Sequence, residues 1–118
     1  MNKVEYLSNI ENCPINKDRI SCMMKIYNVE FSDTLARIIS YADSADFIDD
    51  ERRVLTFEEI VDAGEQLGVD FVSLGMIPII DAYDNDYIVY VFGEAVWAKF
   101  NTIDQVTFKK KNTLQELI

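Results

Sequence analysis

The sequence predicts an α+β fold: a single domain with a mainly antiparallel sheet and helices packed on one face. Two observations lead to this prediction. Segments with helical periodicity are concentrated in the first half of the chain and segments rich in β-branched and aromatic residues in the second, so the two types do not alternate. The chain has 118 residues without a repeat, low-complexity tract or linker. We therefore expect residues 1–118 to form one domain.

The first helix with well-defined ends follows an ambiguous N-terminal segment, residues 1–14. Asn16 is a suitable N-cap, and apolar residues recur at helical spacing from there to Tyr27. Asn28 can end this helix, because asparagine tolerates the left-handed conformation found after many helices.

Two further helices are expected before the main sheet. Ser32 caps the first of them, whose apolar residues form a single stripe that ends at Ala42. Thr56 and Glu59 have the spacing of a capping box and begin the second. This second helix carries acidic residues opposite its apolar face, and Gly68 is a good terminator for it.

The strands are indicated by short apolar runs with turn residues between them. A short strand is expected at 53–55 and a longer one at 77–82, where Pro78 lies near the start and its missing N–H can be tolerated. Residues 84–86 are short polar residues typical of a turn. Residues 87–92 are aromatic and β-branched, which favours a largely buried strand.

The C-terminal part of the chain continues this sheet. Gly93-Glu94 is a Gly-X pair of the kind that favours a tight hairpin, and the next strand is expected at 96–100. A last strand is expected at 105–109, with Val106 and Phe108 facing inward. A short terminal helix follows, with capping-box spacing at its start: Thr113 and Glu116.

The charge is strongly acidic, with 21 acidic against 11 basic residues, no histidine and a net charge of −10. Residues 43–70 hold ten of the acids and only two arginines. Such a field repels nucleic acid and anionic membranes and attracts cationic partners. The alternative is that the excess acid only keeps a small protein soluble.

Several features bear on the compartment. No apolar run approaches the roughly 20 residues of a membrane span, and the first residues lack the apolar core of a signal peptide. Cys13 and Cys22 match no zinc or redox spacing. We therefore expect a cytoplasmic protein with two free thiols.

Asp81, Asp84 and Asp86 are the strongest candidates for a metal site, since Mg²⁺ and Ca²⁺ prefer oxygen ligands. However, the glycine and the final glutamate of a calcium-binding loop are missing, and acids at a strand-to-strand turn are more often turn formers. Without histidine, neither the serines nor the cysteines have the usual base. No glycine-rich phosphate loop is present, so we expect no enzyme, cofactor or metal.

Two other features have competing interpretations. Nucleic-acid binding would rest only on Lys109–Lys111, which are more often solvated residues at a strand end. Trp97 lies on a strand, where alternate side chains point to opposite faces. It is either an exposed aromatic anchor for a partner or a residue packed beneath the N-terminal segment.

The order of the helical and strand segments carries a family resemblance. It depends on Tyr27-Asn-Val-Glu-Phe31, on Gly75-Met-Ile-Pro-Ile79, on Asp84-Asn-Asp-Tyr-Ile-Val-Tyr90 and on Val96-Trp97. In these features residues 20–118 resemble the SUKH superfamily, which contains the Smi/Knr-type yeast cell-wall regulators and many bacterial immunity proteins. The chain departs from the pattern at Phe31-Ser32, where members often have Leu-Pro, and at Asp84-Asn85, which replaces a Gly-rich stretch.

The resemblance implies a binding protein without enzymatic activity. Bacterial members bind and neutralise a cognate toxin, frequently a nuclease, and yeast-type members act as signalling scaffolds. A nuclease binds a polyanion, so its basic cleft would complement this acidic chain. No motif of the family fixes its binding residues. Charge placement selects seven candidates, and Trp97 is added as an aromatic anchor: Asp43, Asp46, Asp49, Asp50, Glu51, Asp84, Asp86 and Trp97. The alternatives are a scaffold or regulatory module unrelated to toxins and, third, a divalent-metal-dependent enzyme.

Overall fold

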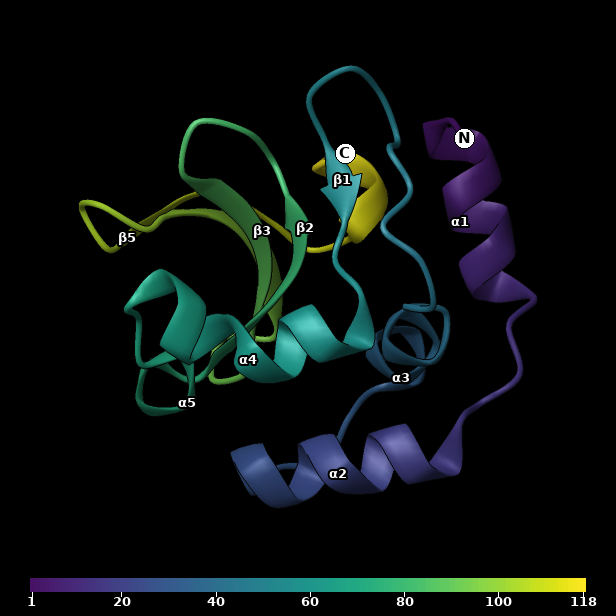
Figure 1. Ribbon diagram of the computed structural model, residues 1–118, viewed down its shortest axis with the longest axis horizontal. Helices are drawn as coiled ribbons and strands as arrows, with labels where there is room; N and C mark the ends of the chain where they lie inside the picture. The colour runs from purple at the N-terminus through teal and green to yellow at the C-terminus, as the bar shows by residue number, and fades with distance from the viewer.

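The computed structural model describes all 118 residues and confirms the α+β fold class (Figure 1). The helices are α1 (Lys3–Glu11), α2 (Lys17–Tyr27), α3 (Asp33–Ser40), α4 (Phe57–Leu67), α5 (Phe71–Leu74) and a terminal 3₁₀ turn, η1 (Leu114–Glu116). The strands are β1 (Arg53–Val54), β2 (Met76–Asp81), β3 (Asp86–Val91), β4 (Val96–Asn101) and β5 (Val106–Lys111). None of the helices is long and apolar enough to cross a membrane.

The sheet is an antiparallel meander in which each strand pairs with the next along the chain, in the order β1-β2-β3-β4-β5. Because neighbouring strands run in opposite directions, the entrance to β1, the β2–β3 turn and the β4–β5 turn all lie at one end. The β3–β4 turn lies at the other end. This arrangement decides which loops can act together.

The core has two parts, one on each face of the sheet. Alternate residues of a strand point to opposite faces, and accordingly Ile88 and Trp97 belong to a large cluster with α1 and α3. Val89 and Phe100 belong to a smaller cluster with α5, in which the rings of Phe71 and Phe100 are 5.7 Å apart. Helices were expected on one face only, and α5 covers the second face as well.

The predicted helix ends agree closely with the structure. The Asn16 side chain caps α2, and Asn28 ends it with φ 55°. The Thr56–Glu59 capping box is complete, and Gly68 ends α4 with φ 66°. The ambiguous N-terminal segment forms α1, which is capped by Asn2 and buries Tyr6 and Ile10.

Two expectations for the C-terminal part are wrong in detail. Val106 was expected to face inward and is 53% exposed, because β5 is an edge strand with no element covering this position. Thr113 makes no side-chain bond to the backbone of η1. Its hydroxyl instead lies 3.0 Å from a carboxylate oxygen of Glu116, so the capping box does not form.

The hairpin between β3 and β4 also differs from the prediction. Val91 pairs with Val96, so the connection has four residues and is not a two-residue Gly-X turn. The left-handed residue is Ala95, with φ 52°, and not Gly93. The turn is closed by Ala95 N–H, which donates to the carbonyl of Phe92 at 3.3 Å.

Substitution of Ala95 by glycine is therefore expected to stabilise the protein by about 1 kcal/mol, since a Cβ disfavours the left-handed conformation. Urea unfolding monitored by circular dichroism measures the change. Ala45→Gly, at an exposed position without positive φ, is the matched control and should not stabilise. A destabilised Ala95→Gly would contradict the conformational explanation.

Candidate functional site

Three loops meet at one end of the sheet, and we call residues 43–52, 82–85 and 102–105 the acidic end. Two of the loops are linked directly: Thr102 N–H donates to the carbonyl of Asn85 at 2.9 Å, and the Asn101 amide donates to Asp86 at 2.9 Å. On the other side, Arg53 of β1 pairs with Asp81 at the end of β2. In Figure 1 the three loops follow one another from the top of the molecule, where the loop before β1 lies, to its left edge, where the β4–β5 turn lies.

The acidic end holds seven acids and a single base, Arg52. Asp43 forms an ion pair with Arg19, and Asp49 forms one with Arg52. The remaining five carboxylates have no ion-pair partner: Asp46, Asp50, Glu51, Asp84 and Asp104. A strong negative potential therefore remains at this end after the internal pairs are considered.

The loop at 43–52 has a defined conformation. The carbonyl of Arg52 accepts from Ile48 N–H at 2.8 Å, and that of Asp46 accepts from Val54 N–H at 2.9 Å. At the tip, Asp49 accepts from the backbone N–H of Glu51 and Arg52 at 3.0 and 2.8 Å. The hydrogen bond from the Arg52 side chain, with those from the backbone, lowers the pKa of Asp49. Asp49 thus stabilises the conformation of the loop that carries the exposed acids Asp46, Asp50 and Glu51.

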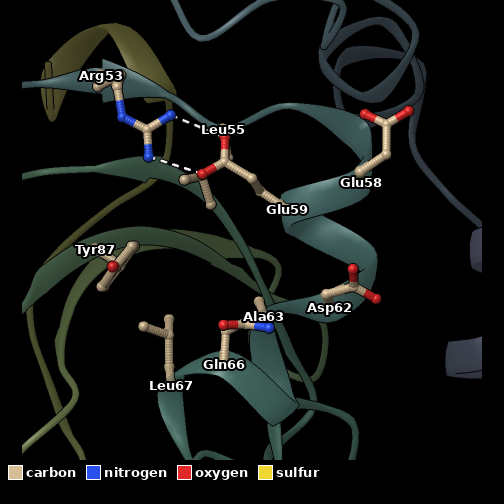
Figure 2. A pocket seen from close by; sticks show the side chains of 9 residues that line it. All are labelled: Arg53, Leu55, Glu58, Glu59, Asp62, Ala63, Gln66, Leu67 and Tyr87. Atoms are coloured by element: carbon tan, nitrogen blue, oxygen red, sulfur yellow. Dashed lines mark hydrogen bonds and ion pairs between the residues drawn. The ribbon is translucent and has the colours of Figure 1, made fainter.

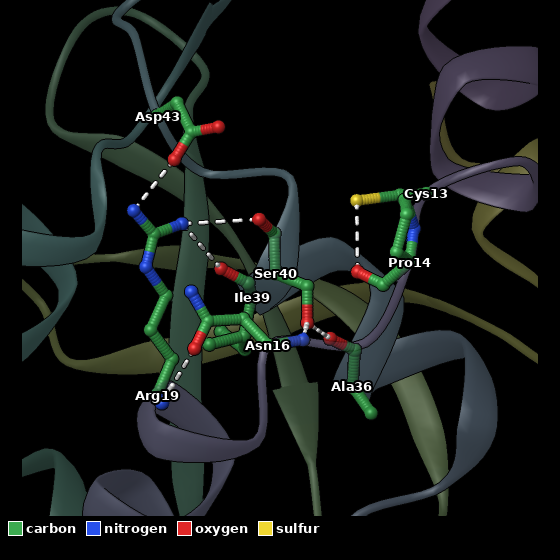
Figure 3. A network of polar contacts seen from close by, with 8 residues as sticks. All are labelled: Cys13, Pro14, Asn16, Arg19, Ala36, Ile39, Ser40 and Asp43. Carbon is green, nitrogen blue, oxygen red and sulfur yellow. Dashed lines mark hydrogen bonds and ion pairs between the residues drawn. The ribbon is translucent and has the colours of Figure 1, made fainter.

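The start of this loop is fastened to the helices (Figure 3). Arg19 on α2 donates to the carbonyl of Ser40 at 3.0 Å and pairs with Asp43. The Ser40 hydroxyl accepts from Asn16 N–H at 2.8 Å and donates to the carbonyl of Ala36 at 2.8 Å. Arg19 therefore caps the C-terminal end of α3, and Asp43 has a structural role.

The predicted site residues are only partly brought together. Asp46, Asp49, Asp50, Glu51 and Asp84 lie in the exposed loops. Asp86 lies in β3, half-buried and hydrogen-bonded to Asn101.

The expectation that Trp97 is an exposed anchor is wrong. Its side chain is only 5% exposed, because the α1–α3 layer covers its face of the sheet. It packs in the large core cluster with Tyr6 and Ile10, as the competing interpretation had it, and its ring lies 4.7 Å from that of Tyr90.

Exposed apolar residues at the acidic end were missed by the sequence analysis. Phe47 is 55% exposed, Tyr83 61% and Ile103 73%. Phe47 forms an isolated β-bridge with Arg53 and its neighbour Ile48 lies in a bend, so no strand pattern in the sequence indicates which of the two is exposed. Ile48 is the buried residue. No pattern in the sequence distinguishes Ile103 from a core residue.

A pocket of about 330 Å³ lies beside the acidic end, between α4 and the sheet (Figure 2). On its upper side the two terminal guanidinium nitrogens of Arg53, Nη1 and Nη2, donate to the two carboxylate oxygens of Glu59 at 2.8 Å each. Tyr87 lies across from this pair, and Glu58 and Asp62 lie on the side of α4 away from Tyr87. Burial and the carboxylate of Asp81 raise the pKa of Tyr87.

The chemistry available in this pocket is limited. The Arg53 guanidinium, with bonds from Thr56, lowers the pKa of Glu59 to about 2, so Glu59 stays ionised near neutrality and is a poor general acid or base. No group of three or more histidine, cysteine, aspartate or glutamate side chains in the structure could hold a metal ion. Asp81, the first residue of the suggested metal set, instead accepts from Tyr83 N–H at 3.0 Å.

The low pKa of Glu59 has a consequence for stability. A carboxylate whose pKa is lower in the folded than in the unfolded state stabilises the fold above the unfolded pKa, about 4.3. This contribution is lost as the pH falls toward 2. Glu59→Gln is expected to cost about 1 kcal/mol at pH 7, in the range of an exposed ion pair, and to flatten the stability profile between pH 4.5 and 2.

Urea unfolding at a series of pH values measures this effect. Glu58 is next to Glu59 on α4 but has no ion pair. Glu58→Gln should therefore leave the loss of stability between pH 4.5 and 2 unchanged. Equal profiles for Glu59→Gln and the unsubstituted protein would contradict the role of the Arg53–Glu59 pair.

Comparison with protein-family models, with curated proteins and with solved structures finds no match to this chain.

Proposed function

We propose that this protein is a non-enzymatic immunity protein that binds a cognate bacterial toxin, a nuclease, through the acidic end. The observation that carries the proposal is the concentration of five unpaired carboxylates on three adjoining loops at one end of the sheet. A nuclease presents basic residues to its polyanionic substrate. The acidic end offers complementary charge to such a surface, and complementary charge speeds association and orients the partner.

Three further features support binding as the function. The acidic loop is held by hydrogen bonds of Asp49 and Arg19, so its carboxylates are presented in a fixed arrangement and little ordering is required on binding. The ionised Glu59 is unsuited to proton transfer near pH 7. The resemblance to the immunity branch of the SUKH superfamily points to the same class of partner.

The test is protection of a cell from the toxin. The toxin domain encoded next to this chain's gene is expressed in a susceptible host together with this protein, and survival is counted. We expect protection by the unsubstituted protein and its loss in the triple variant Asp46→Lys, Asp50→Lys, Asp84→Lys. These three exposed carboxylates have no ion pair, and circular dichroism checks that the fold survives their reversal, including at Asp84, where φ is 54°.

The matched control reverses three exposed acids outside the acidic end, Glu11→Lys, Glu30→Lys and Glu65→Lys. Both variants change the net charge by the same amount, so a general charge effect would impair both. Protection that is equal in the two variants contradicts binding through the acidic end. A neighbouring gene that encodes no toxin, together with a failure to protect, contradicts the immunity function and favours a scaffold.

A further inference from the structure

The acidic end carries apolar side chains at each of its three loops. Phe47 lies in the loop before β1, Tyr83 in the β2–β3 turn and Ile103 in the β4–β5 turn, and more than half of each side chain is exposed. Val106, also 53% exposed, lies directly after the third loop. Exposed apolar residues scattered singly need no explanation, but these residues share one end of the sheet with the unpaired carboxylates, and apolar area rimmed by polar groups is a feature of interaction sites.

The three side chains are close enough to contact one partner. Phe47 pairs with Arg53 of β1, and Ile103 follows the end of β4. Neighbouring strands are about 4.8 Å apart. Four such spacings separate the segment of Phe47, which lies outside β1, from β4. Phe47 and Ile103 are therefore roughly 19 Å apart along the end of the sheet, and Tyr83 lies between them. A standard interface buries about 800 Å² on each partner, and a patch of that area is wide enough to include all three.

The backbone at Tyr83 is unusual for a tyrosine. Tyr83, Asp84 and Asn85 have φ of 76°, 54° and 66°. Asp and Asn tolerate this left-handed region, whereas a bulky aromatic residue does so poorly. Tyr83 as a whole residue is 61% exposed, so core packing does not account for a tyrosine where glycine would be less strained. Strain of this kind is typical of positions kept for function.

We propose that Phe47, Tyr83 and Ile103 enter an apolar groove flanked by basic side chains on the protein partner. This inference rests on the proposed function and specifies the partner's surface: the unpaired carboxylates meet its cations, and the three apolar side chains bury area between them. Interfaces combine a dehydrated apolar centre with a polar rim in this way. A partner with a uniformly polar basic surface would leave the three side chains exposed to water.

The test uses two synthetic peptides of equal charge, Arg-Leu-Arg-Leu-Arg-Leu and Arg-Ser-Arg-Ser-Arg-Ser, titrated into ¹⁵N-labelled protein and followed by NMR. We expect the leucine peptide to bind about tenfold tighter, with shifts at residues 43–52, 82–85 and 102–105. The triple variant Phe47→Ser, Tyr83→Gly, Ile103→Ser should bind both peptides equally. The control Val4→Ser, Ile26→Ser, Val72→Ser removes exposed apolar residues elsewhere and should keep the tenfold preference.

Tyr83→Gly alone separates binding from stability. Relief of the left-handed strain should raise the melting temperature by about 3–5 °C, while the preference for the leucine peptide falls. Equal affinity of the two peptides for the unsubstituted protein, or a preference that survives in the triple variant, would overturn the inference. The proposed function fails separately, through loss of toxin protection, because the peptide preference does not depend on which basic protein is the natural partner.

Discussion

Reversal of Asp46, Asp50 and Asp84 to lysine is expected to slow association with a basic toxin domain by about 10–100-fold at low salt. These residues belong to the five carboxylates of the acidic end that have no ion pair, so their charge acts outward. Long-range attraction affects the encounter rate more than the lifetime of the complex, and the dissociation rate should change less. Stopped-flow mixing with a catalytically inactive toxin domain measures both rates.

The salt dependence separates steering from other effects of the three substitutions. Screening over about 10 Å at 0.1 M salt weakens attraction between exposed charges, so the association rate of the unsubstituted protein should fall steeply with salt. The association rate of the reversed variant should change little with salt, or should rise as salt screens repulsion. The Glu11, Glu30 and Glu65 control variant should retain most of the slope. A triple reversal with an unchanged rate and slope would refute electrostatic docking at the acidic end.

Replacement of Trp97 by alanine is expected to lower the free energy of unfolding by about 3–5 kcal/mol, the usual cost of removing a large aromatic residue from a core. The side chain is 5% exposed and joins the large cluster between the sheet and the α1–α3 layer. Its ring also contacts Tyr90. Urea unfolding followed by circular dichroism measures the loss, because the variant lacks the only tryptophan.

Trp97→Phe is the variant that distinguishes core packing from partner contact. It leaves a smaller cavity and should cost less stability than alanine, while the folded protein should bind its partner with unchanged affinity. A surface anchor would give the reverse result, with little loss of stability and weaker binding. A Trp97→Ala protein as stable as the unsubstituted one would contradict its position in the core.

Helix ends could be predicted from the sequence because they depend on neighbouring residues. Asn16, Asn28 and the Thr56–Glu59 box each act within a few residues of their own position. The β3–β4 turn was less predictable, since several loop lengths accept a glycine and the left-handed position fell at Ala95.

The candidate site was predictable in its charge and not in its apolar part. The local density of acids in 43–51 is visible in the sequence, and the structure adds that Asp43 and Asp49 are internally paired. Alternation along β4 shows that Trp97 and Ala98 face opposite sides, but it does not show that both sides are covered. The burial of both sides depends on α1, which covers one face, and on α5, which covers the other. Neither segment was predicted as a helix, and α1 is also distant from β4 in the sequence.

Amide hydrogen exchange of the complex with the toxin domain tests the central claim most directly. If the protein docks through its three carboxylate-bearing loops, exchange should slow at 43–52, 82–85 and 102–105 and remain unchanged in the opposite turn at 92–95. Slowing confined to 92–95 and the adjoining helix α2, with the three loops unaffected, would contradict it.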